Sequence, residues 1–248
     1  MITSRQNDRI KEVKSLTQKK YRDQKGLYIV EGVKMVAEAI DKGLSVQTIF
    51  ATEKGYAQLL DRVNTDLEVQ LVSDSVFDAI SDEVTPQGVI ATVNKPQNTY
   101  FVADKSCLLL DGVSDPKNVG AIIRTAAASG YTEIYTLNCA DAYSQKSVRA
   151  SMSGIFAVNI YSLEDISELS KIKLPLVIAD MDGENAFDSD IKEIFCLVIG
   201  NEGHGVSQQV KKMAKYTVSI PMQNDMESLN ASVSAGILMY ALKSKIKE

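Results

Sequence analysis

The chain of 248 residues has no tryptophan, one histidine and three cysteines. The cysteines are far apart and lie in or beside apolar runs, which argues against a disulfide framework or a metal cluster and favours buried thiols. No apolar run approaches the ~18 residues that a membrane-spanning helix needs, and the N-terminus has no apolar signal region. We therefore expect a cytoplasmic globular protein that has no metal and no membrane partner. The cysteines are Cys107, Cys139 and Cys196.

An overall positive charge is also absent, because the net charge is −5. Composition as a whole therefore gives no support to a nucleic-acid partner. The first part of the chain differs, since eight basic and three acidic residues between Met1 and Lys25 give a local charge of +5. Such a segment can contact a phosphate backbone, and a solvated basic helix is the simpler alternative.

Hydrophobic spacing alternates between helical and strand patterns along the whole chain. A helix is predicted over Asn7–Lys19, followed directly by a turn and a strand over Lys25–Gly32. Residues 1–97 are predicted to form a small α/β domain, and the polar, proline-containing stretch Asn94–Ser106 a linker. In residues 106–248, short Val/Ile/Leu runs predict strands buried on both faces of a parallel sheet. Ligands bind such sheets beyond the carboxyl ends of the strands.

Three of the predicted strands in this half are followed by an unusual stretch. The first of these stretches is Leu110–Gly130. It places Asn118 at or near the start of a helix and Arg124 two turns further on. An arginine in an otherwise apolar helix needs a partner, so a structural ion pair is one interpretation and a ligand site is the other.

The second is the glycine-rich stretch Val198–Ser207, in which Gly200, Gly203 and Gly205 follow a predicted buried strand. Glycines at such a point allow the backbone to approach another group closely. Their order, G-x-x-G-x-G, is not the G-x-G-x-x-G of dinucleotide-binding folds, which argues against a nucleotide-dependent oxidoreductase. His204 could act as a base, but a loop histidine is more often a surface residue, and no G-x-S-x-G nucleophile elbow is present.

The third runs from Ile220 to Leu242 and joins a proline-marked loop to an apolar helix predicted over Val233–Leu242. The free N–H groups of a helix N-terminus suit a phosphate, a carboxylate or the edge of a nucleotide. A capped helix packed on the core is the alternative. Between loop and helix lies a polar cluster, Glu227, Ser228, Asn230 and Ser232, in which Ser228 and Asn230 are good N-cap residues.

Together, Asn118-Val-Gly-Ala-Ile-Ile-Arg124, Gly200-Asn-Glu-Gly-His-Gly-Val-Ser207 and Ile220-Pro-Met with Ser228-Leu-Asn-Ala-Ser232 resemble three signature motifs. These are the motifs of the SpoU/TrmH family of RNA ribose 2′-O-methyltransferases, in family order and spacing. Upstream, Ile2–Asn7, Tyr28–Gly32 and Pro86–Val89 resemble the family's N-terminal substrate-binding domain. Lys146–Phe156 resembles a segment of members that act on 23S ribosomal RNA.

The resemblance implies an α/β chain with two domains. Residues 1–97 would be an L30e-like RNA substrate-binding domain, and residues 106–248 a parallel-sheet SPOUT methyltransferase domain with a C-terminal trefoil knot. It also implies S-adenosylmethionine as cofactor, a homodimer, and an RNA substrate, with 23S ribosomal RNA favoured. A transfer RNA methyltransferase and a non-catalytic ribosomal RNA-binding or assembly protein are the alternatives.

The resemblance also assigns residues to roles. For Arg124 the resemblance implies the role of the base that takes the proton of the hydroxyl. Because an arginine guanidinium stays protonated, we instead expect Arg124 to bind the target phosphate and orient the hydroxyl, with base character only in an unusual environment. Lys117, Gln145 and Ser234 depart from common family residues. The candidate catalytic residues are Arg124, Asn118, Glu202, Ser228 and Asn230. The candidate cofactor-binding residues are Gly200, Asn201, Glu202, Gly203, Ile220, Met222, Leu229 and Asn230. The candidate RNA-binding residues are Arg5, Arg9, Lys11, Lys20, Arg22, Lys146 and Arg149.

Overall fold

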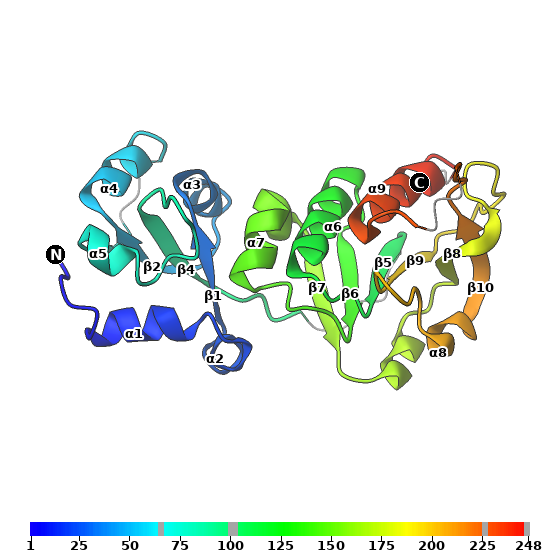
Figure 1. Cartoon of the computed structure of the whole chain (residues 1–248), viewed down its shortest axis with the longest axis horizontal. Helices are drawn as coiled ribbons and strands as arrows, with labels where there is room; N and C mark the ends of the chain where they lie inside the picture. Colours follow the sequence, from blue (N-terminus) through cyan, green and yellow to red (C-terminus); the bar gives the residue numbers. More distant parts are fainter. Residues whose placement is uncertain (64–66, 99–103, 225–227, 246–248) are drawn as a thin grey trace. The chain divides into compact units, whose positions relative to one another are not determined.

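The computed structural model describes residues 1–63, 67–98, 104–224 and 228–245, and its elements are shown in Figure 1. Glu227 and residues 99–103 of the predicted linker lie outside the described residues. The chain divides into two compact units. Unit 1 comprises Met1–Gln97 and Tyr143–Phe156, and unit 2 comprises Asn98–Ala142 and Ala157–Glu248. The domain limits predicted along the sequence, 1–97 and 106–248, stay predictions.

Unit 1 contains a four-stranded sheet of order β1-β4-β2-β3. β4 pairs antiparallel with β1 and with β2, whereas β2 and β3 are parallel. The carboxyl ends of β2 and β3 therefore lie at the same edge as the amino end of β4. The strands are β1 (Leu27–Glu31), β2 (Val46–Ala51), β3 (Val69–Leu71) and β4 (Val89–Asn94). The helices are α1 (Asp8–Ser15), α2 (Lys19–Lys25), α3 (Val33–Asp41), α4 (Glu53–Leu60), α5 (Asp74–Phe77) and α7 (Gln145–Ser151). The 3₁₀ helix η1 (Met152–Ala157) follows α7.

The predicted helix over Asn7–Lys19 is wrong in its extent, because α1 ends at Ser15 and a second helix, α2, precedes β1. Arg22 of α2 explains the break. Its Nη1 donates to the carbonyl oxygens of Leu16 at 2.7 Å and Thr17 at 2.8 Å, so it satisfies backbone groups in the turn between the helices. Gly26 then ends α2 in the left-handed conformation with φ of 64°.

Unit 2 contains a six-stranded sheet of order β10-β8-β9-β5-β6-β7, in which every neighbouring pair is parallel. This confirms the predicted parallel sheet. In the register, Asp111 at the end of β5 lies beside Gly200 at the end of β9. The strands are β5 (Cys107–Asp111), β6 (Glu133–Leu137), β7 (Asn159–Leu163), β8 (Leu176–Asn185), β9 (Cys196–Gly200) and β10 (Ala214–Ser219).

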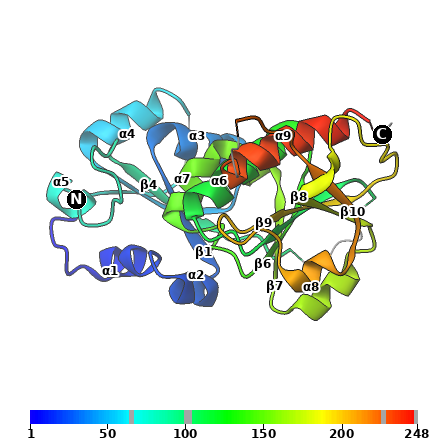
Figure 2. The same cartoon turned by 45° about the vertical axis from the view of Figure 1, so that its right-hand side comes forward.

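Helices cover both faces of this sheet (Figures 1 and 2). α6 (Pro116–Ser129) and α9 (Ala231–Lys243) lie side by side on one face, and Lys243 Nζ of α9 donates to the carbonyl oxygen of Ser129 at 2.7 Å. The short α8 (Gln208–Lys211) and the 3₁₀ helix η2 (Ile166–Lys171) lie on the other face. α6 begins at the N-cap Asp115, whose side chain accepts from Lys117 N, followed by a proline at the first helical position.

The core of unit 2 is built from strands that are buried along their whole length, such as β5, β6 and most of β9. Cys107 and Cys196 are neighbours in this core, fully buried and not disulfide-bonded, which confirms the predicted buried thiols at those two positions. Cys139 is a partly buried free thiol. Within the part of the chain that the structure describes, no helix is long and apolar enough to cross a membrane.

Candidate functional site

Three loops meet beyond the carboxyl ends of β5, β9 and β10. We name them the first loop (residues 112–118), the glycine loop (residues 200–207) and the C-terminal loop (the described residues 220–224 and 228–230). The first two start from adjacent strands, because Asp111 and Gly200 are paired in the sheet. Asp111 also accepts a hydrogen bond from the backbone N–H of Ser207 at 2.7 Å, which fixes the far end of the glycine loop.

The glycine loop is a closed hairpin. Asn201 and Gly205 exchange two backbone hydrogen bonds of 2.9 Å, and Asn201 Oδ1 accepts from the N–H of Gly203 at 2.9 Å. A Cβ atom at Gly200 would lie 2.2 Å from the carbonyl carbon of Gly205, so only glycine fits there. Asn201 Nδ2 donates to the carbonyl oxygen of Gly112 at 2.8 Å and so ties this hairpin to the first loop.

One residue from each loop contributes to a polar network. Asn230 Nδ2 donates to Asn118 Oδ1 at 3.0 Å, and Asn118 Nδ2 donates to Glu202 Oε1 at 2.9 Å. Asn118 is 8% exposed and stands at the centre of this chain of contacts, whereas Glu202 and Asn230 are exposed. The sequence placed these three residues on separate loops, and the structure brings them together.

Glu202 has an unusual number of donors around its carboxylate. Besides Asn118, it accepts from the backbone N–H of Ser114 at 3.2 Å, the Ser114 hydroxyl at 3.1 Å and the backbone N–H of Asp115 at 3.3 Å. Partial burial opposes ionisation, but these hydrogen bonds outweigh it and lower the pKa of Glu202 to about 2. The side chain is therefore a carboxylate at neutral pH.

Asn230 is also the N-cap of α9. Its Oδ1 accepts from the backbone N–H groups of Ser232 at 2.9 Å and Val233 at 3.4 Å. One side chain thus ends the C-terminal loop, begins α9 and contacts Asn118, so the position of the helix start is coupled to the network. Ser228, the other predicted cap, is exposed two residues earlier and is not the N-cap.

A pocket of about 400 Å³ lies between the glycine loop, the C-terminal loop, the first turns of α9 and the middle of β8. Its wall includes seven of the predicted cofactor-binding residues, namely Gly200, Asn201, Glu202, Gly203, Ile220, Met222 and Leu229, and also Ser228. Asn230 is not part of the wall and acts through the network instead. His204 also lines the pocket, with its Nδ1 3.1 Å from Asn201 Oδ1.

Sequence reasoning missed one side of this pocket, which Asp180, Met181 and Lys211 form. Asp180 and Lys211 are an ion pair, and the hydrogen bond from Lys211 lowers the pKa of Asp180. A signal was present in the sequence, because Asp180 directly follows the apolar run Leu176–Ala179, where a strand buried in a parallel sheet would approach a ligand. Its partner on α8 is distant in sequence.

Arg124 lies on the exposed side of α6 and outside the pocket wall. None of the described residues forms a hydrogen bond or ion pair with its side chain, so the structural ion pair considered for it is not found within the described part of the chain. An exposed cation on the same helix as Asn118 is free to meet an anion that comes from outside the chain.

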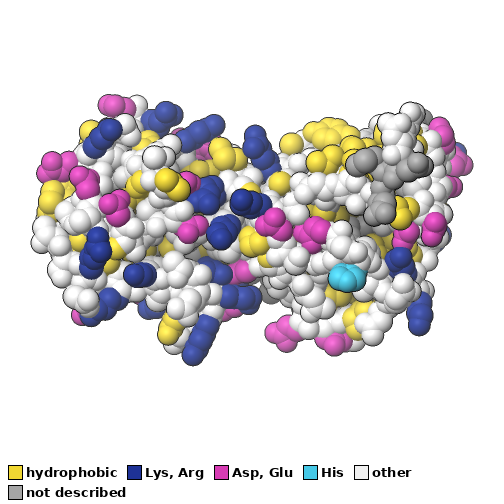
Figure 3. All heavy atoms as spheres, in the orientation of Figure 1, with side chains coloured by type: hydrophobic (Ala, Val, Ile, Leu, Met, Phe, Trp, Pro, Cys, Tyr) yellow, Lys and Arg dark blue, Asp and Glu magenta, His cyan; other side chains and the backbone are white. Residues whose placement is uncertain are grey.

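The candidate RNA-binding residues differ in what their side chains already contact. Arg5, Arg9, Lys11, Lys20 and Lys146 are exposed, and Figure 3 shows basic side chains spread over unit 1. Arg149 is in ion pairs with Asp82 at 3.7 Å and Glu83 at 2.9 Å. Arg22 is 3% exposed and bonded to its own backbone, so the RNA-binding prediction is wrong for this residue.

Among the described residues, no group of three or more His, Cys, Asp or Glu side chains is arranged so that it could hold a metal ion.

Comparisons with known proteins decide the family. The model of the SpoU rRNA methylase family matches residues 105–240, more than half of the chain, and that of the MRM3-like substrate binding domain matches residues 7–91. This chain belongs to the SpoU rRNA methylase family. The recognition made from the three motifs is thereby confirmed.

Relatives match along nearly the whole length. The 23S rRNA (guanosine(2553)-2′-O)-methyltransferase RlmP of Bacillus subtilis is 29% identical over 98% of each chain. The 23S rRNA (uridine(2479)-2′-O)-methyltransferase of Streptomyces viridochromogenes is 30% identical over 99% of this chain and 92% of its own length. The structure of the SpoU methyltransferase AviRb from that organism in complex with AdoMet has a TM-score of 0.85 at 28% identity, covering 96% of this chain and 98% of AviRb.

The structural likeness confirms the predicted fold class. Unit 2 has the parallel sheet of the SpoU methyltransferases, whose shared fold contains a trefoil knot. The strand order agrees with such a path, because β9 follows β8 in sequence but inserts between β8 and β5.

Proposed function

We propose that this SpoU family chain transfers a methyl group from S-adenosylmethionine to a ribose 2′-hydroxyl of RNA, and that 23S ribosomal RNA is the substrate. The observation that carries the proposal is the network Asn230–Asn118–Glu202, which joins all three motif loops beside a pocket of cofactor size. The relatives named as 23S rRNA 2′-O-methyltransferases match over the full chain and support the same reaction and substrate class.

The pocket fits S-adenosylmethionine in size and in lining. A volume of about 400 Å³ lies within the range of small-molecule sites. Ile220, Met222 and Leu229 would offer apolar surface to the adenine, and Gly200, Gly203 and Gly205 line the pocket without side chains that would obstruct it. When bound, the cofactor supplies a methyl group activated by the sulfonium.

The protein's contribution to methyl transfer is alignment, since hydroxyl, methyl and sulfur must stand in line. Glu202 and Asn118 hold the first loop against the glycine loop, and Asn230 adds the start of α9. Arg124 would bind the phosphate next to the target ribose and orient its hydroxyl, because its guanidinium is exposed and has no partner among the described residues. Ser228, at the pocket wall, would hydrogen-bond the incoming ribose or cofactor.

The RNA must present its target nucleotide unpaired or splayed, because both the 2′-hydroxyl and the base edge have to be reachable. Exposed basic residues of unit 1, such as Arg5 and Lys20, would contact neighbouring phosphates and make binding depend on salt. The two relatives methylate different nucleotides of 23S rRNA, so the target nucleotide does not follow from family membership. We also propose that the protein acts in the cytoplasm.

We also propose a homodimer formed through α9. Val233, Ile237 and Tyr240 recur at helical spacing on one side of this helix, and Val233 and Tyr240 are 49% and 56% exposed. Figure 3 shows hydrophobic side chains gathered over the α6–α9 part of this face. Sedimentation or light scattering should give twice the 27.1 kDa mass of one chain. Replacement of both Val233 and Tyr240 by Glu should give the monomer, whereas Phe187→Glu, at another exposed apolar residue, should not.

The test of the activity uses S-adenosylmethionine with a deuterated methyl group, incubated with the protein and ribosomal RNA. Nucleoside mass spectrometry should then detect a labelled 2′-O-methylnucleoside. Calorimetry with the cofactor alone separates the alternatives, because a non-catalytic RNA-binding protein would bind RNA but give no labelled product. Labelling of transfer RNA in place of 23S rRNA would change the substrate and leave the reaction intact.

A further inference from the structure

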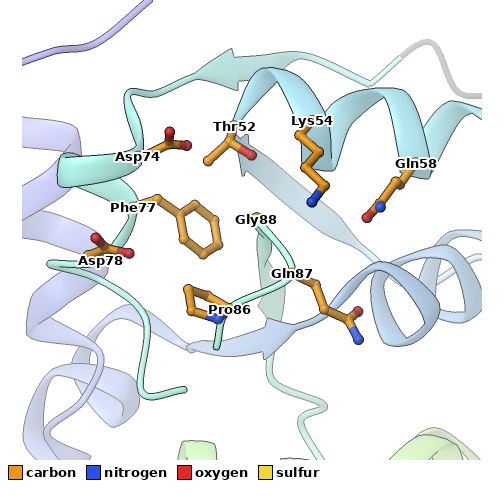
Figure 4. Close-up of a pocket in the computed structure, with 9 residues that line it drawn as sticks. All are labelled: Thr52, Lys54, Gln58, Asp74, Phe77, Asp78, Pro86, Gln87 and Gly88. Atoms are coloured by element: carbon orange, nitrogen blue, oxygen red, sulfur yellow. The ribbon is translucent and has the colours of Figure 1, made fainter. Parts of the chain in front are cut away.

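Unit 1 contains a second pocket of about 450 Å³, entirely formed by its own residues (Figure 4). It lies at the edge of the sheet where β2 ends and β4 begins. Lys54 and Gln58 extend into it from α4, while α5 contributes Asp74, Phe77 and Asp78 from the other side. The remaining lining residues are Thr52, Pro86, Gln87 and Gly88.

The wall between α4 and β4 is rigid because it is built from backbone. Thr52 N–H donates to the carbonyl oxygen of Gly88 at 2.9 Å, and Thr52 Oγ1 caps α4 by accepting from Gly55 N at 3.1 Å. A Cβ atom at Gly55 would lie 2.1 Å from Gly88 O, so a side chain there cannot fit. The pocket is therefore pre-formed on this side.

Most of its polar side chains have no partner among the other described residues. Within the described part of the chain, Lys54, Gln58, Asp74 and Asp78 make no side-chain hydrogen bond or ion pair, although opposite charges line the same pocket. Gln87 uses Oε1 to accept from the N–H of Val33 at 2.9 Å, which leaves its Nε2 available. The pocket thus offers free donors and free acceptors around a small apolar floor.

The lining selects the kind of ligand. Two carboxylates, Asp74 and Asp78, repel a phosphate, so a phosphate group is a poor occupant. The buried ring of Phe77 and the half-buried Pro86 give an apolar floor, as Figure 4 shows between the two sets of polar side chains. A planar, uncharged group with donors and acceptors on its edge fits this combination, and an unstacked nucleobase has that form.

We propose that this pocket binds one unpaired base of the RNA substrate, with guanine the best match. The N1–H and amino group of guanine can donate together to one carboxylate, and its O6 can accept from Lys54. The site rests on the proposed function for its RNA, but lies in unit 1 and takes no part in methyl transfer. Arg5 donates from Nε to Ser75 O at 3.0 Å beside Asp74, so its exposed guanidinium is placed for an adjacent phosphate.

The test is equilibrium binding of fluorescein-labelled 11-residue oligoribonucleotides to the full-length protein. One probe is all uridine, and the others carry a single central G, A or C. The G probe should bind about five- to tenfold more tightly than the uridine probe, the lower part of the range for a two-bond base contact. Asp78→Asn or Asp74→Asn should remove this preference while the uridine probe binds as before, and Asp61→Asn, elsewhere on the surface of unit 1, should keep it.

Two results of these binding measurements would refute the base pocket. If the four probes bind alike, or if Asp74→Asn with Asp78→Asn leaves the G preference intact, the base pocket is refuted. Lys54→Gln should weaken the G probe more than the uridine probe, with Lys42→Gln as its control. An equal loss for all probes would make Lys54 a backbone contact and contradict the proposal. Cofactor calorimetry on the same variants keeps the two proposals apart, because failure to bind S-adenosylmethionine bears only on the methyltransferase site.

Discussion

Replacement of Asn118 by alanine tests whether the three motif loops depend on one another. The change removes the hydrogen bond to the Glu202 carboxylate and the one from Asn230. A bond to a charged group contributes about 1.5–3 kcal/mol and a neutral one about 0.5–1.5 kcal/mol. Because both partners are exposed and can turn to water, we expect the lower end, a loss of about 2 kcal/mol in the free energy of unfolding.

The same change should weaken cofactor binding. The largest effect on binding arises if the full loss of about 2 kcal/mol must be made up when the cofactor orders the glycine and C-terminal loops. In that case Kd for S-adenosylmethionine rises about 30-fold. Urea unfolding and calorimetry measure the two quantities, and methyl transfer should fall at least as far as the affinity. An Asn118→Ala variant with the affinity and turnover of the parent chain would refute the network.

Asn159→Ala is the matched control for this variant. Asn159 also donates from Nδ2 to a glutamate, Glu133, at 3.0 and 3.2 Å, but at the amino end of the sheet, away from the loops. It should lose a similar amount of stability and keep its affinity for S-adenosylmethionine. Equal loss of affinity in both variants would mean that Asn118 acts only through general stability.

Four further variants give separate tests. Arg124→Lys keeps the charge but loses the planar fork, so the methyl-transfer rate should fall at least tenfold while cofactor affinity and Tm stay unchanged; near-normal turnover would end that assignment. Glu202→Gln should lower the free energy of unfolding by about 1 kcal/mol at pH 7, after allowance for solvent screening. In urea unfolding, the difference in stability between parent and variant should fade as the pH falls from the ordinary glutamate pKa of 4.5 towards about 2. The reason is that a pKa lowered in the folded state stabilises the protein only while the carboxylate is ionised. Gly200→Ala, whose Cβ would meet backbone at 2.2 Å, should abolish detectable cofactor binding by calorimetry, whereas Gly203→Ala, whose nearest contact is 3.7 Å, should bind; the reverse order would contradict the hairpin geometry. Arg22→Met should lower the free energy of unfolding by about 2 kcal/mol and leave RNA affinity and its salt dependence as they were.

Local rules predicted much of the fold. Buried Val/Ile/Leu runs located the strands, and the N-cap signal at Asn230 was correct because capping depends on neighbours along the chain. Arg22 shows the limit of such rules. Counting charges places it among solvated basic residues, whereas its guanidinium satisfies carbonyl groups in the turn before its own helix.

The site was predictable in its parts and not in its assembly. Polar residues at three strand ends indicated three loops, but the strand order β8-β9-β5 decides which loops meet, and that order is a long-range property. Asp180 and Lys211 were missed for the same reason, since their ion pair joins β8 to α8. The knot came from the family resemblance alone, because no hydrophobic pattern encodes the threading of a chain.

The most direct test of the central claim is a map of ribose 2′-O-methylation across ribosomal and transfer RNA from cells with and without this protein. The account predicts that one 23S ribosomal RNA position loses its methyl group and regains it when the intact gene, but not the Arg124→Lys version, is restored. Ribosomal and transfer RNA with every 2′-O-methyl group still present would contradict the claim.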